Sequence, residues 1–161
     1  MRHAKSGYPD GVADHGRPLA DRGNREAPLA GEWIRAHVPE VEAVLCSTAT
    51  RTRQTLARTG IEAPTEFLDE LYDATPGTVL AAINAVDDDV RTLLVVGHEP
   101  TTSSLALGLA GSDDADQAAT DAANEIAAKF PTSAIAVLRT DVSWADLELG
   151  GATLVAFHVP R

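Results

Sequence analysis

Two arginines and two histidines, spread over three segments, are the residues of this chain best suited to chemistry. Arg2 and His3 open the sequence, whereas Arg51 and His98 each follow a separate apolar segment. A guanidinium pairs with two phosphate oxygens at once and keeps its charge, and a neutral imidazole is available near pH 7 to attack phosphorus. The set therefore predicts a metal-free phosphoryl site, in which one histidine forms a covalent intermediate and the other stabilises charge.

The places of these residues along the chain support a single shared site. Arg51 follows shortly after Ser47, where the apolar segment 41–47 ends, and His98 directly follows the apolar segment 92–97. In open α/β sheets, ligands bind beyond the carboxyl ends of the strands. We therefore expect Arg51 and His98 to face the same crevice.

Alternating apolar strands and helices organise the rest of the chain. Strands are expected at 41–47, 66–68, 92–97, 133–138 and 153–159, and helices at 24–37, 50–58, 77–86, 100–109 and 115–129. This alternation predicts a three-layer α/β/α sandwich with a mostly parallel central sheet. No internal repeat or linker interrupts it, so residues 1–161 are expected to form one domain. Pro28 is expected in the first turn of its helix, and Gly60 as a helix C-cap.

Composition limits the partners of the protein. The chain carries 24 acidic and 13 basic residues, a formal net charge of −11, so its surface repels nucleic acid and anionic membranes. Cys46, the single cysteine, rules out an internal disulfide and lies in an apolar strand, where it is expected to be buried. No apolar run reaches the ~18 residues of a membrane span, and no signal peptide is recognisable. A cytoplasmic protein is expected, with its oligomeric state open.

Four segments resemble, in order and spacing, the signatures of the histidine phosphatase superfamily, whose better known branch includes the phosphoglycerate mutases. They are Met1–Ser6 (MRHAKS), Leu19–Gly23 (LADRG), Ser47–Thr55 (STATRTRQT) and Val96–Pro100 (VGHEP). The short length, the alanine after His3 and the Arg17-Pro18-Leu19 element are similar to the small SixA-like branch, named for bacterial phosphohistidine phosphatases. The resemblance implies a phosphoglycerate mutase-like fold and phosphatase activity without a cofactor.

The resemblance also implies a role for each of the four residues. His3 would be the nucleophile that becomes phosphorylated, and Arg2 and Arg51 would bind the phosphoryl oxygens. His98 would be the second histidine of the pocket. Arg17 either lies at the rim of the pocket, where it would bind substrate, or braces the polar loop.

A general acid is the least defined part of the implied site. Larger relatives place a glutamate or aspartate after the second helix, and Glu70 is the best candidate in this chain, with Asp73 behind it. SixA-like members often lack a clear equivalent. This is chemically reasonable, because the imidazole of a phosphoramidate leaves more easily than an alkoxide.

Several alternatives stay open at this point. The substrate could be a phosphohistidine on a protein or a small phosphomonoester, and a non-catalytic module that binds a phosphorylated ligand belongs to a different functional class. The presence of His3 argues against such a module, since binding alone would need only the arginines. A metal site formed by His3, His98 and Cys46 is disfavoured, because Cys46 is expected in the core.

The start of the chain sets one structural question. In relatives an apolar strand precedes the Arg-His pair, and here only Met1 stands before Arg2. The first strand is therefore expected to be truncated: either the chain is shorter than the natural one, which we favour, or the sheet closes over a gap. On the first interpretation, about five added apolar residues would raise stability.

Overall fold

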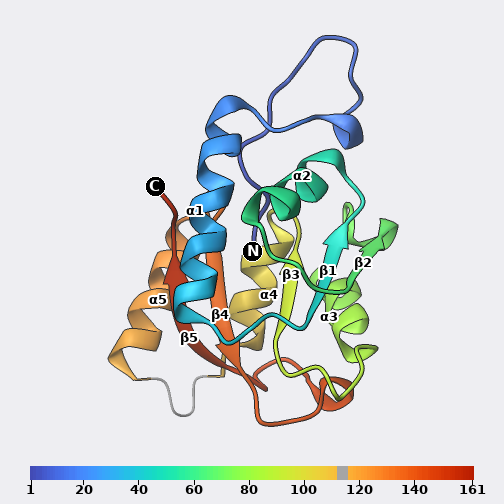
Figure 1. Ribbon diagram of the computed structural model, residues 1–161. Coiled ribbons are helices and arrows are strands. Elements are labelled where there is room, and N and C mark those ends of the chain that lie inside the picture. Colours follow the sequence, from blue (N-terminus) through green and yellow to red (C-terminus); the bar gives the residue numbers. More distant parts are fainter. Residues whose placement is uncertain (112–115) are drawn as a thin grey trace.

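Strands lie in the middle of the molecule and helices cover both faces in the computed structural model, which describes residues 1–111 and 116–161 (Figure 1). The elements in chain order are η1 (Asp14–Gly16), α1 (Asp21–His37), β1 (Ala43–Ser47), α2 (Thr50–Thr59), β2 (Thr65–Leu68), η2 (Asp69–Leu71), α3 (Pro76–Asn84), β3 (Leu93–Val96), α4 (Thr101–Leu109), α5 (Gln117–Ala128), β4 (Ile135–Arg139), η3 (Trp144–Asp146) and β5 (Thr153–His158). Every predicted strand and helix is found, with ends shifted by at most three residues. Residue 115, where one helix was expected to begin, lies outside the described residues.

The strands form a parallel group and an antiparallel pair. β1 lies between β2 and β3 and is parallel to both, with Val44 opposite Thr65 on one side and Leu94 on the other. β4 pairs with β5 in the antiparallel sense. Within the described residues, β3 and β4 do not pair with each other.

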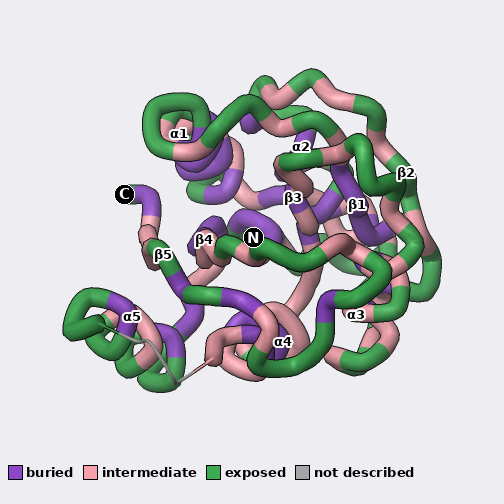
Figure 2. The backbone as a smooth tube through the Cα atoms, turned by 90° about the horizontal axis from the view of Figure 1, so that it is seen from below, coloured by how far each residue is buried: buried purple, intermediate pink, exposed green. Residues whose placement is uncertain are grey.

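Side chains of the parallel strands alternate between two buried layers. Val44 and Cys46 pack with residues of α1 and α2, whereas Leu45 packs with residues of α3 and α4. Seen along the layers, α1 and α2 cover one face, and α3, α4 and α5 cover the other (Figure 2). Because both faces are covered, the strands are apolar on both faces. This confirms the predicted three-layer α/β/α sandwich with a parallel central sheet.

The helix ends confirm one expectation and correct another. Gly60 is the C-cap of α2 in the left-handed conformation, with a φ of 68°. The expectation that Pro28 lies in the first turn is wrong, because α1 begins at Asp21 and places Pro28 in its interior. The missing N–H of Pro28 leaves the carbonyl of Asn24 without its partner in the helix. The early start is hidden in the sequence because Gly23 lowers the helix propensity there.

The first residues lie between the two groups of strands. Gly97 N donates to Met1 O and His3 N donates to Gly97 O, both at 3.0 Å, so this segment follows the end of β3. On its other side, Arg2 N donates to Ala134 O at 3.0 Å, just before β4. The first strand is thus reduced to one β-bridge, between Arg2 and Gly97.

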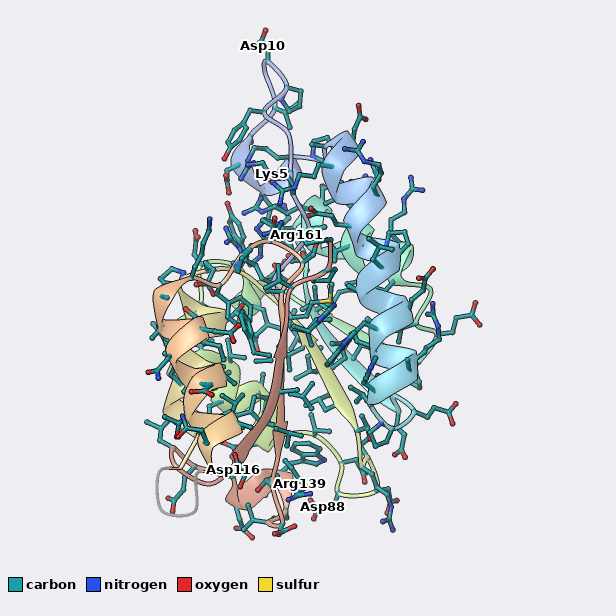
Figure 3. The ribbon with its side chains drawn as sticks, turned by 90° about the vertical axis from the view of Figure 1, so that its left-hand side faces the viewer. Lys5, Asp10, Asp88, Asp116, Arg139 and Arg161 are labelled. Carbon is teal, nitrogen blue, oxygen red and sulfur yellow. The ribbon has the colours of Figure 1, made fainter. Side chains whose placement is uncertain are left out.

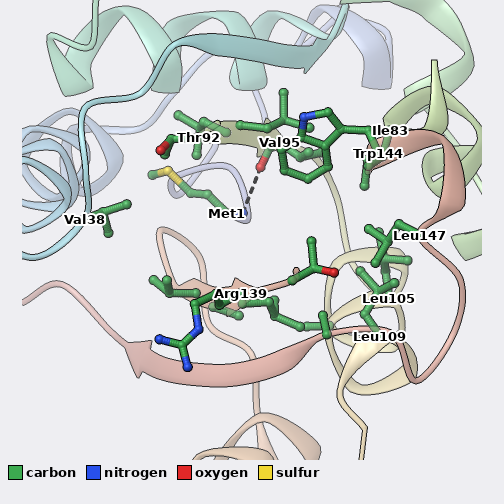
Figure 4. A pocket seen from close by; sticks show the side chains of 18 of the residues that line it. Met1, Val38, Ile83, Thr92, Val95, Leu105, Leu109, Arg139, Trp144 and Leu147 are labelled. Atoms are coloured by element: carbon green, nitrogen blue, oxygen red, sulfur yellow. Dashed lines mark hydrogen bonds between the residues drawn. The ribbon is translucent and has the colours of Figure 1, made fainter. Parts of the chain in front are cut away.

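Beyond Met1, an apolar cavity separates β3 from β4. Its volume is about 920 Å³, and its walls include Leu105, Leu109 and Leu147 (Figure 4). The Met1 amino group donates to Val95 O at 2.8 Å at the edge of this cavity (Figure 4). β3 and β4 therefore lie on opposite sides of the cavity and do not pair within the described residues. No described helix has the length and apolar character needed to cross a membrane.

Candidate active site

The four residues singled out by the sequence lie at one end of the sheet. His98 follows β3, and Arg51 lies in the first turn of α2, just beyond β1. Arg2 and His3 reach the same end through their backbone bonds to Gly97 and Ala134. In Figure 3 this is the end of Lys5 and Asp10, opposite the end that carries Asp88 and Arg139.

His3 is buried and held in a single tautomer. Only 7% of the surface of His3 is exposed, and its Nδ1 lies 2.7 Å from the carbonyl oxygen of Ala4. A carbonyl only accepts hydrogen bonds, so Nδ1 carries the hydrogen and the lone pair of Nε2 is free. Burial, together with the positive charges around the ring, lowers the pKa of His3 to about 3. The imidazole is therefore neutral at pH 7 and nucleophilic at Nε2.

His98 faces His3 and is oriented by Ser47. The two ring centroids are 5.3 Å apart. Ser47 Oγ accepts from Ala49 N at 3.3 Å and lies 2.8 Å from Nε2 of His98. Among the described contacts, Nε2 is the one acceptor within reach of the hydrogen of this buried hydroxyl, so the hydroxyl is satisfied when it donates to Nε2. Nδ1 of His98 then carries a hydrogen, and it is buried without a partner. Burial and the charge of Arg51 lower the pKa of His98 to about 4, so the ring donates a hydrogen bond while neutral.

The two arginines are only partly satisfied by the protein. Arg2 Nη1 donates to Phe130 O, and Arg51 Nη1 donates to Asp14 O, both at 2.7 Å. The Nε atoms of Arg2 and Arg51 are buried and have no hydrogen-bond partner. Both guanidinium charges lower the pKa of both site histidines, which shows that the four side chains share one electrostatic environment. Unpaired buried N–H groups are costly, and an anion bound among them would satisfy them.

Asp14, in η1, connects the rim of the site to Arg51. Its carboxylate accepts from Arg51 Nη2 at 3.2 Å, from Arg17 Nε at 3.0 Å and from Tyr72 Oη at 2.5 Å. Tyr72 in turn packs edge-on against His98, with ring centroids 5.6 Å apart. Arg17 also donates to Ser6 Oγ at 2.6 Å, so it joins Asp14 to the polar loop, and among the described residues its link to Arg51 runs through Asp14.

Glu70 and Asp73, the candidates for a general acid, are exposed on the surface near η2. No described hydrogen bond or ion pair joins either of them to the site histidines or arginines. The same segment instead brings Tyr72 to the site. The role of Glu70 as a proton donor therefore stays a prediction without a supporting contact.

The remaining motif residues hold the first segment in place. Thr55 Oγ1 accepts from Ala4 N, and Gln54 Oε1 accepts from Leu19 N, each at 2.8 Å, so both tie α2 to the N-terminal loop. A Cβ on Gly23 would lie 2.1 Å from Lys5 O, so only glycine allows α1 to approach this backbone. These contacts explain the glutamine, threonine and glycine of the matched segments.

The described residues offer no cluster of three or more His, Cys, Asp or Glu side chains that could hold a metal ion. Cys46 is fully buried, and burial raises the pKa of its thiol to about 12, so it is a poor ligand and nucleophile.

Three residues that contact the site had no role assigned from the sequence. Ser47 was visible only as the first residue of its matched segment, Asp14 as an acidic residue close to Arg17, and Tyr72 as a neighbour of Glu70. None of them stands out by residue type. Their roles depend on contacts between segments far apart in the chain, such as the 58 positions that separate Asp14 from Tyr72.

Comparison with known sequences gives two informative relatives. An uncharacterised protein of Mycobacterium tuberculosis is 65% identical over 161 residues, the whole of both chains. The phosphohistidine phosphatase SixA of Escherichia coli is 32% identical over 149 residues, which cover 89% of this chain and 84% of that protein. No protein-family profile matches the chain.

Comparison with solved structures agrees. A SixA-type protein from Nakamurella multipartitia has 44% identity and a TM-score of 0.90, covering 99% of this chain and 93% of that one. The protein histidine phosphatase SixA, solved in complex with tungstate, has 28% identity and a TM-score of 0.75, covering 98% and 92%. Likeness of this degree, over nearly the whole length, means that the chain belongs to the SixA-like branch of the histidine phosphatase superfamily, a branch of phosphatases.

Proposed function

We propose that this chain is a metal-independent phosphatase that removes phosphoryl groups from phosphohistidine in proteins, through a covalent intermediate on His3. The observation that carries the proposal is the pairing of a free, neutral Nε2 on His3 with unpartnered buried nitrogens on Arg2, Arg51 and His98. A nucleophile and a set of anion-binding donors are thus held at one place.

Two chemical steps follow from this arrangement. The lone pair of His3 Nε2 forms a bond to phosphorus as the bond to the leaving group breaks, and the leaving group takes that electron pair. Water then attacks phospho-His3, which releases inorganic phosphate and returns the neutral imidazole. Arg2 and Arg51 oppose the charge on the phosphoryl oxygens in both steps, and His98 donates from Nδ1.

A relative that binds a tetrahedral oxyanion supports the proposed phosphoryl chemistry. The SixA structure with tungstate shows that a protein of this branch binds such an anion. Tungstate resembles phosphate in shape and charge, and the donor set here suits either anion. The preference for phosphohistidine rests on the named function of the relative from Escherichia coli.

Labelling of the protein tests the nucleophile directly. After incubation with a radiolabelled phosphohistidine peptide, the parent is expected to carry an acid-labile, alkali-stable phosphoryl adduct that is lost in His3→Ala. His37→Ala, which changes an exposed histidine of α1, is the matched control and should keep the adduct. Equal hydrolysis by the parent and His3→Ala, without an adduct, would overturn the proposal.

Two further measurements define the reaction. Activity should persist in excess chelator, and its loss there would contradict metal independence. A panel of phosphohistidine peptides, sugar phosphates and aryl phosphates then ranks the substrates by kcat/KM. A protein that binds phosphorylated ligands but turns over none of them would instead be a non-catalytic binding module.

A further inference from the structure

The carboxylate of Asp14 has an unused acceptor position at the mouth of the site. A carboxylate offers about four lone-pair positions. Three are taken in this structure: Arg51 and Tyr72 bind Oδ2, and Arg17 binds Oδ1. The side chain of Asp14 is 56% exposed, so the remaining position on Oδ1 is open to a ligand.

This carboxylate cannot act as a proton donor. The hydrogen bond from Tyr72, followed by those from Arg17 and Arg51, holds the pKa of Asp14 well below its usual range. The same bond raises the pKa of Tyr72, whose hydroxyl hydrogen is committed to Asp14. The two groups therefore present a fixed negative charge and an accepting oxygen.

The depth of each residue places Asp14 on the side of the leaving group. His3 and Arg51 are 7% and 5% exposed, so the nucleophile attacks from the buried side. The attacking and leaving atoms lie roughly in line through phosphorus. The leaving group therefore departs toward the open mouth, where Asp14 stands.

Leaving groups differ in what they require there. The imidazole ring of a phosphohistidine has a second nitrogen, and when that nitrogen carries a hydrogen, the ring departs as neutral imidazole without a proton donor. The oxygen of a phosphomonoester departs as an anion unless it receives a proton. A fixed carboxylate accepts a hydrogen bond from the N–H of a departing imidazole and so stabilises it. The same carboxylate repels the negative charge that develops on the departing oxygen of a phosphomonoester.

We propose that Asp14 is a selectivity residue, which accepts a hydrogen bond from the non-phosphorylated ring N–H of the substrate and so favours phosphoimidazoles over phosphomonoesters. The proposal rests on the phosphatase function proposed above. In the transfer step, the P–N bond breaks, its electron pair stays on the departing nitrogen, and the other ring nitrogen keeps its hydrogen against Asp14.

The test compares two small substrates of similar size, phosphoimidazole and phenyl phosphate. Asp14→Asn removes the charge and keeps the shape of the side chain. It is expected to lower kcat/KM for phosphoimidazole more than for phenyl phosphate, so that the ratio of the two falls about 10-fold or more. Asp10→Asn is the matched control, because it removes one charge from the tip of the same loop (Figure 3). Its ratio should equal that of the parent.

The other outcomes are distinct. If Asp14 only positions Arg51, both substrates lose activity by the same factor, the ratio is unchanged, and the proposal is overturned. If Asp14 is an internal anion that competes with substrate, Asp14→Asn raises both rates, which also overturns it. If the parent itself forms no phospho-His3 adduct, the proposed function fails and not only the role of Asp14. Adduct labelling of the parent therefore separates failure of the proposed function from failure of the selectivity proposal.

Discussion

His98 shows how a single neighbour sets the chemistry of a residue. Ser47 is fully buried, accepts from the Ala49 backbone and turns its own hydrogen toward His98. The ring is thereby fixed with its hydrogen on Nδ1. The sequence predicted that one histidine stabilises the phosphoryl charge, and the free site holds His98 as a neutral ring that can donate through Nδ1.

Replacement of Ser47 by alanine should expose this dependence. Ser47→Ala leaves Nε2 of His98 without its donor, so the ring can adopt the wrong tautomer. We expect kcat to fall about 10- to 100-fold with a smaller change in KM, measured with a phosphohistidine peptide. Ser104→Ala, at an exposed position of α4, is the control and should retain activity. An unchanged kcat in Ser47→Ala would show that the tautomer is set in another way.

The two buried histidines also make stability depend on pH. Their pKa values fall to about 3 and about 4 in the folded protein, from 6.5. Below pH 6.5 the unfolded chain therefore binds protons that the folded chain does not, and stability decreases as pH falls toward 4. One such proton changes the free energy of unfolding by about 1.4 kcal/mol per pH unit.

Urea unfolding of the parent and His3→Asn between pH 7.5 and pH 4.5 measures this contribution. The difference between the two proteins should change with pH, because only the parent loses the contribution of His3 as the solution becomes acidic. Two parallel stability curves would contradict the prediction.

Residue types, positions after strands and the matched segments together predicted that the two arginines and two histidines share a site, because few other side chains suit a phosphoryl group. Asp14 and Tyr72 could not be found in this way. Their importance comes from hydrogen bonds across the fold, and an aspartate or tyrosine in a polar loop has the same composition whether it meets Arg51 or only solvent.

At the scale of the elements, α1 approaches the backbone just after His3 so closely that a side chain at Gly23 would not fit. The carbonyl of Lys5 accepts from Ala20 N at 2.9 Å, and the Cα of Gly23 lies against that same carbonyl. The glycine that conceals the start of α1 in the sequence is therefore the residue that makes its packing possible.

Gly23→Ala tests this contact. The added Cβ would lie 2.1 Å from Lys5 O, so the backbone near His3 must shift. We expect a loss of about 1–3 kcal/mol in the free energy of unfolding and a marked loss of activity, measured by urea unfolding and by phosphatase assay. In the control Gly77→Ala, the nearest atom to the Cβ is 3.8 Å away, so stability and activity should be kept. Equal behaviour of the two variants would refute the steric account.

The order and type of the elements were predictable because apolar segments and turn residues recur with clear spacing. The exact ends of the helices and strands were less predictable. The start of α1 at Asp21 depends on the packing of Gly23, and the separation of β3 from β4 depends on which backbones meet in space. Neither property has a local sequence signal.

At the scale of the whole molecule, the cavity between β3 and β4 is lined mainly by apolar side chains. Both strands present an unpaired edge to it within the described residues. Burial lowers the pKa of the Met1 amino group to about 5, which means that the charged form of this group is disfavoured in the folded protein.

A designed extension of five extended, apolar residues ahead of Met1 should therefore stabilise the protein. Its side chains would enter the cavity, and its backbone would pair with β3 and β4. We expect the free energy of unfolding to rise by at least about 2 kcal/mol, measured by urea unfolding. A five-residue glycine-serine extension removes the same amino group without adding apolar surface, and should give a much smaller gain. If both extensions raise the free energy of unfolding equally, the gain comes from moving the buried amino group and not from filling the cavity.

The backbone of Met1–His3 binds β3 on one side and the segment before β4 on the other. His3, the proposed nucleophile, is thus part of the seam where the parallel group of strands meets the segment before β4. A ligand that separated these two parts of the molecule would disturb the backbone of His3 itself, so we expect it to inhibit the protein without contacting Arg51 or His98.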